Sequence, residues 1–217
     1  ITILCSLLNH YYLLNNEVAK HNDKMDKKYG IQLCEPAYPH YDSHVGRMSG
    51  MLPGLFENGG VYNHCNAFKI MADCRLGRAE QALSTLHKMI PDSKDNPVSI
   101  TGAEPYLFVN CWCMHPSFFT RIWFGWFTGT SAWALRGFYE GICGLRRENG
   151  GLRVQPCIPG AWKELTLTRT FRGCRYHIHI SNTGSGKPEV TVDGNRLADT
   201  LLPVLNDGQI HEVVVRT

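Results

Sequence analysis

The segment best suited to bind an anion is the short turn Thr128-Gly129-Thr130. It follows an aromatic stretch, and residues 123–133 together hold three of the five tryptophans. An apolar run follows and predicts a helix over residues 130–143. The first backbone N–H groups of a helix lack intrahelical partners and lie at the positive end of its dipole, so this turn could hold a phosphate. Thr128 or Thr130 could equally be an ordinary N-cap of a core helix.

Two further helices are expected upstream of this turn. Apolar residues at 61, 65, 68, 71 and 72 follow helical spacing, and Gly77 ends the run. A second helix over residues 79–89 is stopped by Pro91. Joined by one tight turn, the two predict an antiparallel helical hairpin. Residues 29–53 and 92–125 are rich in loop-forming residues, and long ordered loops often carry function.

The pattern changes after Gly150-Gly151. Alternating or β-branched segments follow at residues 152–154, 165–171, 176–180, 189–192 and 212–215, separated by turn sequences such as Asp193-Gly194. We therefore expect an α+β multidomain chain. Residues 1–150 form a mainly helical part and residues 151–217 an antiparallel β-sandwich.

Composition excludes several classes of protein. Apolar residues make up 43% of the chain and charged residues 19%, and the net charge of +3 is scattered, which argues against nucleic-acid or membrane partners. No apolar run approaches the ~20 residues of a membrane span. Residues 1–8 lack the features of a signal peptide, and residues 1–20 could form a helix. Nine cysteines without paired spacing predict reduced thiols in the cytoplasm, and ten histidines without metal spacing predict no metal site.

Four ordered segments carry a resemblance to a known family. They are ENGGVYNH at residues 57–64, EPY at 104–106, WFTGT at 126–130 and GLRVQPCIP at 151–159. The chain resembles the C-terminal portion of glycoside hydrolase family 94, inverting phosphorylases that act on cellobiose, chitobiose and related β-linked sugars. The resemblance covers roughly residues 29–217. It implies the end of an (α/α)6 barrel followed by a C-terminal jelly-roll, and family members often pair as homodimers.

The resemblance also implies a phosphate-binding site at His64, Thr128 and Gly129. Inverting phosphorolysis uses phosphate where an inverting hydrolase uses activated water, so the protein must hold and orient phosphate. An imidazole can donate a hydrogen bond to a phosphate oxygen, and glycine allows close backbone approach. The alternative for His64 is a core histidine bonded to a nearby carbonyl.

Glu57 matches a family position that binds the sugar in the acceptor-side subsite. Its alternative is a carboxylate favoured by a helix dipole. The family usually has Lys immediately before this Glu, whereas this chain has Phe56. The identity of the acceptor sugar therefore does not follow from the family resemblance.

Three further residue types could belong to the sugar pocket. Asn110 stands where cellobiose-type members carry Gln, although a loop Asn is often a turn former. Glu104 could shape the same pocket or brace its loop. Trp126 and Trp133 could stack on sugar rings, but aromatics beside a buried helix more often belong to the core.

No catalytic residue is expected within the chain. The family's general acid is an Asp upstream of the His motif, hence upstream of Ile1. Asp42 lies in a loop without a matching motif, and Asp73 lies two and a half helical turns beyond His64.

The expected function is that of a fragment of an inverting phosphorylase. The parent would use inorganic phosphate as co-substrate, need no cofactor, and convert a β-linked di- or oligosaccharide into an α-sugar 1-phosphate. The alternatives are a non-catalytic carbohydrate-binding or decayed module, or part of a larger β-glucan-processing protein.

Overall fold

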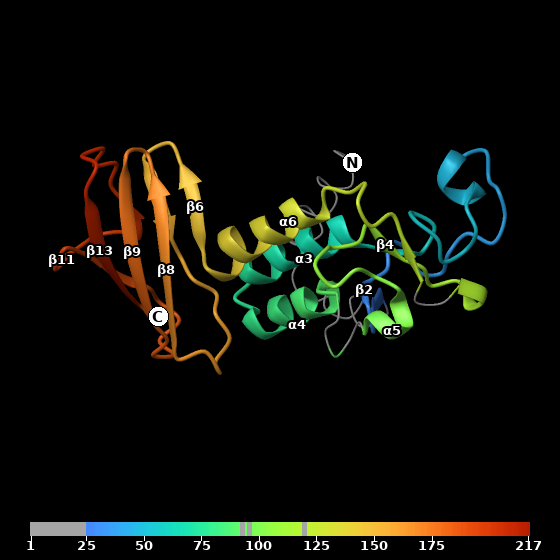
Figure 1. Ribbon diagram of the computed structural model, residues 1–217, viewed down its shortest axis with the longest axis horizontal. Coiled ribbons are helices and arrows are strands. Elements are labelled where there is room, and N and C mark those ends of the chain that lie inside the picture. The colour runs from blue at the N-terminus through green and yellow to red at the C-terminus, as the bar shows by residue number, and fades with distance from the viewer. Residues whose placement is uncertain (1–24, 92–93, 95–96, 119–120) are drawn as a thin grey trace. The chain divides into compact units, whose positions relative to one another are not determined.

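The computed structural model describes residues 25–217 except 92–93, 95–96 and 119–120. The helix expected over residues 1–20 and the signal-peptide question lie outside these residues. The chain divides into two compact units. The first holds residues up to Ala72 and Ala82–Gly137, and the second holds Asp73–Gln81 and Phe138–Thr217. Figure 1 shows helices together with several sheets, which confirms an α+β chain.

Helices α3 (Asn63–Arg75) and α4 (Ala79–Met89) form the predicted hairpin. The first begins two residues later than expected because Val61–Tyr62 pairs as strand β3. Gly77 lies between the helices with φ of 71°, a conformation that glycine adopts without a Cβ penalty. One face of α4 is buried through Ala82, Thr85, Leu86 and Met89, at the spacing of an amphipathic helix.

The third expected helix changes character along its length. Helix α6 spans Thr130–Arg136, and a π-helical turn, η3, continues it over Gly137–Ile142. Gly129 is the N-cap residue and no side chain caps the helix, so neither threonine is the N-cap.

A small antiparallel sheet lies in the stretch expected to be irregular. It pairs β3 with β4 (Cys111–Trp112) and β4 with β5 (Ile122–Trp123). Trp112 of β4 belongs to one buried apolar cluster with Tyr29 and Val109. Such two-residue strands are too short to show an alternating pattern, so the sequence could not indicate them. Short elements complete this unit: β1 (Asp26–Lys27), β2 (Gly30–Ile31), η1 (Gly46–Gly50), α5 (Val98–Thr101) and η2 (Pro116–Phe118).

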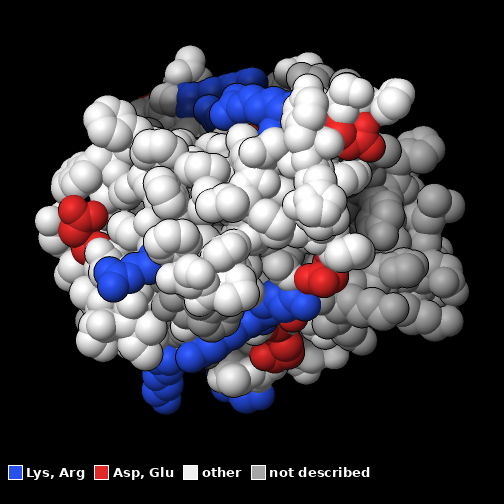
Figure 2. Space-filling view, turned by 90° about the vertical axis from the view of Figure 1, so that its right-hand side faces the viewer, with Lys and Arg blue, Asp and Glu red and all other residues white. Residues whose placement is uncertain are grey.

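Figure 2 shows the side of the molecule that carries η1 at the right of Figure 1. The middle of this face carries few Lys, Arg, Asp or Glu side chains, whereas several of both signs form a band across its lower part. Within the described residues, no helix has both the length and the apolar character needed to cross a bilayer. Eight of the nine cysteines are described, and all eight are free thiols.

The second unit contains two sheets. The three-stranded sheet has the order β12 (Leu201–Leu202), β7 (Gly151–Val154), β6 (Leu145–Glu148). The five-stranded sheet has the order β11 (Asn195–Arg196), β10 (Glu189–Val192), β13 (Ile210–Arg216), β9 (Cys174–Ser181), β8 (Glu164–Phe171). The expectation of a fully antiparallel sandwich is wrong at one pair, because β13 runs parallel to β9. The long connection between them, which carries β10 to β12, makes a parallel neighbour possible.

Alternating side chains form the interior of this unit. Tyr176, Ile178 and Ile180 of β9 are buried, as are Val213 and Val215 of β13. The Tyr176 hydroxyl donates a hydrogen bond to the carbonyl of Pro203, which follows β12. This bond ties the five-stranded sheet to the segment that leaves the three-stranded sheet.

Candidate functional site

The Thr128 hydroxyl contacts several other polar side chains of the candidate site. Its Oγ1 accepts hydrogen bonds from the Asn110 side-chain amide at 3.1 Å and from the Thr130 backbone N–H at 3.1 Å. It also lies 2.7 Å from Thr130 Oγ1 and 3.3 Å from His64 Nε2. A hydroxyl has one proton and two lone pairs. The two N–H donors fill the lone pairs, so one proton remains for either Thr130 or His64.

The distances favour Thr130 as the partner of that proton. The contact to Thr130 Oγ1 is 0.6 Å shorter than the contact to His64 Nε2 (3.3 Å minus 2.7 Å). His64 Nε2 is then held beside the turn without a strong partner of its own. A ring nitrogen in this position can donate to an external acceptor. Burial lowers the pKa of His64 below its ordinary value, which keeps the ring neutral near pH 7.

Gly129 lies directly beside this nitrogen and brings no side chain toward it. A Cβ placed on Gly129 would lie 3.6 Å from His64 Nε2 and 3.8 Å from Trp133 Cδ1. Gly129 is exposed, whereas Thr130 beside it is buried. The backbone here is not in the left-handed region, with φ of −86°. The backbone conformation therefore does not demand glycine here, and the lack of a side chain keeps the volume of a methyl group free beside His64 Nε2.

A buried amide network sets the position of His64 at the start of α3. Asn63 is fully buried; its backbone N–H donates to the Asn110 carbonyl at 2.9 Å, and its side chain donates to the Val109 carbonyl at 2.9 Å. Asn66 donates to the Asn63 side chain at 2.9 Å and accepts from the Ile31 N–H at 2.8 Å. These bonds join the first turn of α3 to β2 and to residues 109–110, which immediately precede β4.

Asn110 is fixed from both sides. Its carbonyl accepts from Asn63 and its N–H donates to the Phe124 carbonyl at 2.9 Å. The side chain is 7% exposed and reaches Thr128 rather than open solvent. The structure thus brings Asn110 together with His64, Thr128 and Gly129. As arranged, Asn110 positions Thr128.

Glu104 holds an exposed tryptophan. Its Oε1 accepts a hydrogen bond from Trp126 Nε1 at 3.0 Å, and Oε2 would lie 3.0 Å from a Cβ on Gly125. Trp126 is 63% exposed and Tyr106 lies beside it, with ring centroids 6.0 Å apart. Of the two alternatives for Trp126, the core position is therefore excluded. Trp133 does pack against Phe68, edge to face at 4.7 Å.

Glu57 lies apart from the hydrogen bonds that join the cluster. Its carbonyl accepts a weak bond from the Cys34 thiol at 3.7 Å. Its carboxylate is close enough to Cys111 of β4 to raise the pKa of that thiol, although burial is the larger cause. Phe56 beside it has φ of 46° and stacks on Phe124 at 5.7 Å.

The sequence did not indicate the roles of Thr130, Asn63 and Asn66. The second hydroxyl of the Thr-Gly-Thr turn completes the Thr128 bonds, and the two asparagines flank His64 at positions that become helical. Asparagine disfavours helix interiors, so two of them in one helical turn were the available signal. Among the described residues, no group of three or more His, Cys, Asp or Glu is arranged to hold a metal ion.

The cluster therefore offers uncharged donors beside the exposed Gly129. A neutral imidazole and exposed backbone beside a helix start can bind an anion without a fixed positive charge. No carboxylate is hydrogen-bonded to His64 or Thr128 in the described part of the chain. Asp42 bonds within its own loop to His44 and Ser49, and Asp73 is 1% exposed on α3. Neither is placed to protonate a ligand at this cluster.

Comparisons with known proteins assign the chain to a family. Residues 16–144 match the model of the glycosyl hydrolase 94 superfamily catalytic domain, and residues 145–186 match that of the glycosyl hydrolase family 65 C-terminal domain. Solabiose phosphorylase of Paenibacillus borealis is 36% identical over 199 residues, which cover 89% of this chain and 26% of that protein. The 3-O-beta-D-glucopyranosyl-beta-D-glucuronide phosphorylase of the same organism is 34% identical over 200 residues, again 89% and 26%.

A third relative is the N,N'-diacetylchitobiose phosphorylase of Vibrio furnissii. It is 31% identical over 179 residues, which cover 76% of this chain and 21% of that protein. This chain spans about a quarter of the length of these curated relatives. Since the first model matches more than half of the residues, the resemblance seen in the sequence is confirmed: the chain belongs to the glycosyl hydrolase 94 superfamily.

Proposed function

We propose that the complete protein containing this chain is an inverting glycoside phosphorylase. It cleaves a β-linked di- or oligosaccharide with inorganic phosphate and releases an α-sugar 1-phosphate and a shorter sugar. The family membership and the names of the three relatives, all phosphorylases, support this activity. Residues 1–150 would be the end of an (α/α)6 barrel and residues 151–217 a jelly-roll.

The observation that carries the proposal is the proximity of Thr128 and Gly129 to one nitrogen: His64 Nε2 lies 3.3 Å from Thr128 Oγ1, and a Cβ on Gly129 would lie 3.6 Å from it. In this proposal phosphate lies beside that nitrogen, with the His64 ring and the backbone N–H of Gly129 as donors. Phosphate attacks the anomeric carbon from the face opposite the leaving sugar. An Asp upstream of Ile1 protonates the leaving oxygen, since no carboxylate of the cluster is available. Orienting one phosphate oxygen is then the main contribution of this chain.

The sugar pocket is proposed to include Glu57, Glu104 and Asn110. Glu104 would act through Trp126, because its bond to the indole N–H fixes an exposed ring that a sugar face can stack against. Asn110 would act through Thr128. Glu57 would contact the acceptor sugar directly, with Phe56 in place of the usual Lys altering which sugar is accepted. We further propose a cytoplasmic homodimer; the eight free thiols support the compartment, and the dimer rests on the family resemblance alone.

The test is phosphate-dependent release of sugar 1-phosphate by the complete protein across a panel of β-linked disaccharides. His64→Ala should lower kcat/KM by about 10- to 100-fold, the worth of one hydrogen bond to a charged group. His44→Ala is the matched control, since the His44 side chain is 94% exposed and, among the described residues, bonds to Asp42 alone. Full phosphorolysis by His64→Ala would refute the assignment of His64.

A sugar-binding protein without catalysis is the second candidate. The exposed and anchored Trp126, with Tyr106 beside it, favours this reading because such a platform binds sugar without phosphate. Binding of the panel sugars with no release of sugar 1-phosphate, and no effect of His64→Ala on binding, would establish it.

A further inference from the structure

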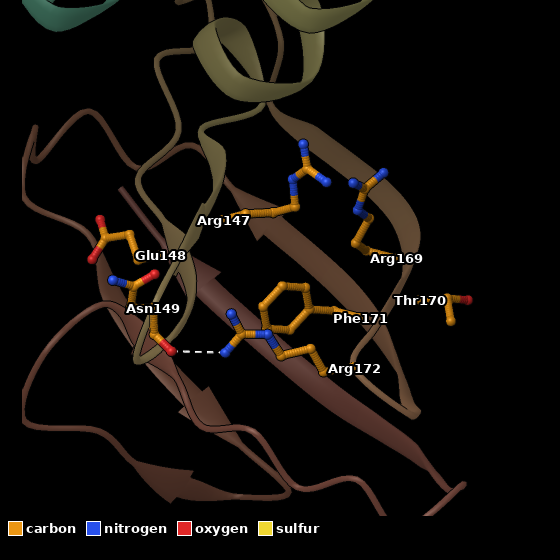
Figure 3. Close-up of a pocket in the computed structure, with 7 residues that line it drawn as sticks. All are labelled: Arg147, Glu148, Asn149, Arg169, Thr170, Phe171 and Arg172. Atoms are coloured by element: carbon orange, nitrogen blue, oxygen red, sulfur yellow. Dashed lines mark hydrogen bonds between the residues drawn. The ribbon is translucent and has the colours of Figure 1, made fainter.

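A hollow of about 560 Å³ opens in the second unit between two edge strands. Strand β6 is the last strand of the three-stranded sheet and β8 the last strand of the five-stranded sheet. Residues 147–149 line the hollow from the first hairpin and residues 169–172 from the second. Figure 3 shows the side chains of Arg147 and Arg169 reaching toward the same part of it. None of its lining residues belongs to the His64 cluster.

Arg169 occupies a position where the strand pattern calls for an apolar side chain. On β8, the side chains of Leu165, Leu167 and Phe171 alternate with more exposed threonines, and Arg169 shares their face. Its Nε is buried and has no hydrogen-bond partner among the described residues. Its guanidinium lies 5.9 Å from the Tyr139 ring centre. A buried donor without a partner costs free energy unless a ligand supplies the acceptor.

The charges around the hollow are unbalanced. Arg147, Arg169 and Arg172 line it, and Glu148 is the one acidic residue among the lining side chains. That carboxylate is bound to Arg153 through contacts of 2.5 Å and 3.0 Å, and this pairing lowers the pKa of Glu148. Arg172 donates to the Asn149 carbonyl at 2.7 Å, which joins the two hairpin ends. Arg147 has no ion-pair partner within the described residues.

Protection of sheet edges explains only part of this arrangement. Charged side chains on edge strands discourage pairing with another chain. Such protection needs a charge on each strand separately. It does not require guanidinium groups from two different sheets to face one shared hollow, where like charges repel.

We propose that this hollow binds a small oxyanion, a phosphate or carboxylate group carried by a small metabolite, with Arg147 and Arg169 as its main ligands. A guanidinium presents paired N–H donors whose spacing matches two oxygens of either group. Arg172 closes the end of the hollow beside Phe171, over whose ring its guanidinium lies at 5.0 Å. The bound anion would balance the charge and supply an acceptor for Arg169 Nε.

The experiment measures binding to the complete protein by calorimetry and, in parallel, by hydrogen exchange of the peptides that contain β6 and β8. The probes are inorganic phosphate, glucose 1-phosphate and citrate. Hydrogen exchange separates this hollow from the proposed phosphate site at His64, because the two lie on different peptides. Arg147→Gln is the main variant, since Arg147 is exposed and its loss does not disturb the core. Arg169→Gln is the second variant.

Arg175→Gln is the matched control, because Arg175 is an exposed arginine of neighbouring β9 that does not line the hollow. We expect anion-dependent protection of β6 and β8 and a Kd weakened about 10-fold by Arg147→Gln, with little change in the control. Protection by the two phosphate compounds alone identifies a phosphate ligand, and protection by citrate alone a carboxylate ligand. The proposal is overturned if no probe protects these peptides, or if Arg147→Gln and Arg175→Gln behave alike. Absence of binding with a lowered Tm for Arg147→Gln would instead assign the hollow to an acidic side chain of the protein itself.

Discussion

At the scale of single residues, the state of His64 determines what its site can do. Burial lowers the pKa of the ring, and no carboxylate bonded to it opposes that shift. A neutral ring donates from one nitrogen only. Donation from Nε2 toward the space beside Gly129 therefore requires the proton on Nε2, and the Thr128 hydroxyl, already bonded to Thr130, leaves that proton available.

Gly129→Ala tests that space without disturbing the fold. The new Cβ would lie 3.6 Å or more from its neighbours, and loss of glycine at an N-cap costs at most about 1 kcal/mol. Because the methyl group would occupy the space beside His64 Nε2, we expect KM for phosphate to rise roughly 10-fold with little change in Tm. Steady-state kinetics at varied phosphate would measure it. Gly160→Ala is the control, as its Cβ would lie 3.8 Å from the nearest atom, Glu80 Oε1. An unchanged KM would place phosphate elsewhere.

His211 makes a second prediction, this time about stability. Its ring nitrogens bond to Asp193 at 2.8 Å and Asp207 at 3.1 Å, and the two carboxylates raise the pKa of His211. A raised folded-state pKa gives stability that is fully present below the unfolded-state value near 6.5. That contribution is lost as pH rises through the raised value. Thermal unfolding of the protein and of His211→Gln should therefore differ most in mildly acidic buffer, and the difference should shrink toward alkaline pH. A difference that grows with pH would show that the aspartates do not stabilise the charged ring.

At the scale of secondary structure, periodicity predicted the long elements and failed for the short ones. Helix α4 and strand β10 have the bounds that the sequence indicated, because turns or Pro91 end them sharply. The sequence did not predict strand β6, because its residues, Leu145–Glu148, are mostly charged and do not alternate between polar and apolar side chains. The parallel pairing of β13 with β9 depends on long-range contacts that no local pattern records.

The junction of η3 and β6 depends on one glycine. Gly144 has φ of 68°, and a Cβ there would lie 1.9 Å from the Gln155 carbonyl oxygen. Gly144→Ala should combine backbone strain with overpacking and lower the free energy of unfolding by about 2–6 kcal/mol. Gly184→Ala separates the two effects, since φ is 77° but nothing lies within 4 Å. Its expected cost is about 1 kcal/mol, from strain alone. Chemical denaturation would give both values, and equal losses would mean that the contact with Gln155 relaxes.

At the scale of the whole molecule, sequence reasoning could name the candidate residues but not their contacts. The resemblance pointed to His64, Thr128 and Gly129, and the fold brings these three together with Asn110. The resemblance did not predict the hydrogen bond from Asn110 to Thr128 or the one from Trp126 to Glu104, because each joins two different loops. Loop-to-loop hydrogen bonds leave no periodic trace in sequence, so a structure was needed to find them.

The last prediction concerns the chain by itself. It spans about a quarter of its relatives' length, and none of its described carboxylates is bonded to the His64 cluster. Phosphorolysis needs a general acid that protonates the leaving oxygen as well as a phosphate-binding site. We therefore expect the 217-residue chain alone to release no sugar 1-phosphate, whereas the reading frame extended upstream of Ile1 does so when phosphate is present.

Replacing the proposed general-acid Asp by Asn in the complete protein should remove activity, while the proposed phosphate binding at His64 should persist. Activity of the chain alone would contradict this assignment and place the acid within it. Asp42→Asn and Asp73→Asn would then be the first variants to compare, since one carboxylate lies in a loop and the other is buried on α3. A loss in one variant but not the other would identify the acid, because Asn keeps the shape of Asp and removes only its proton chemistry.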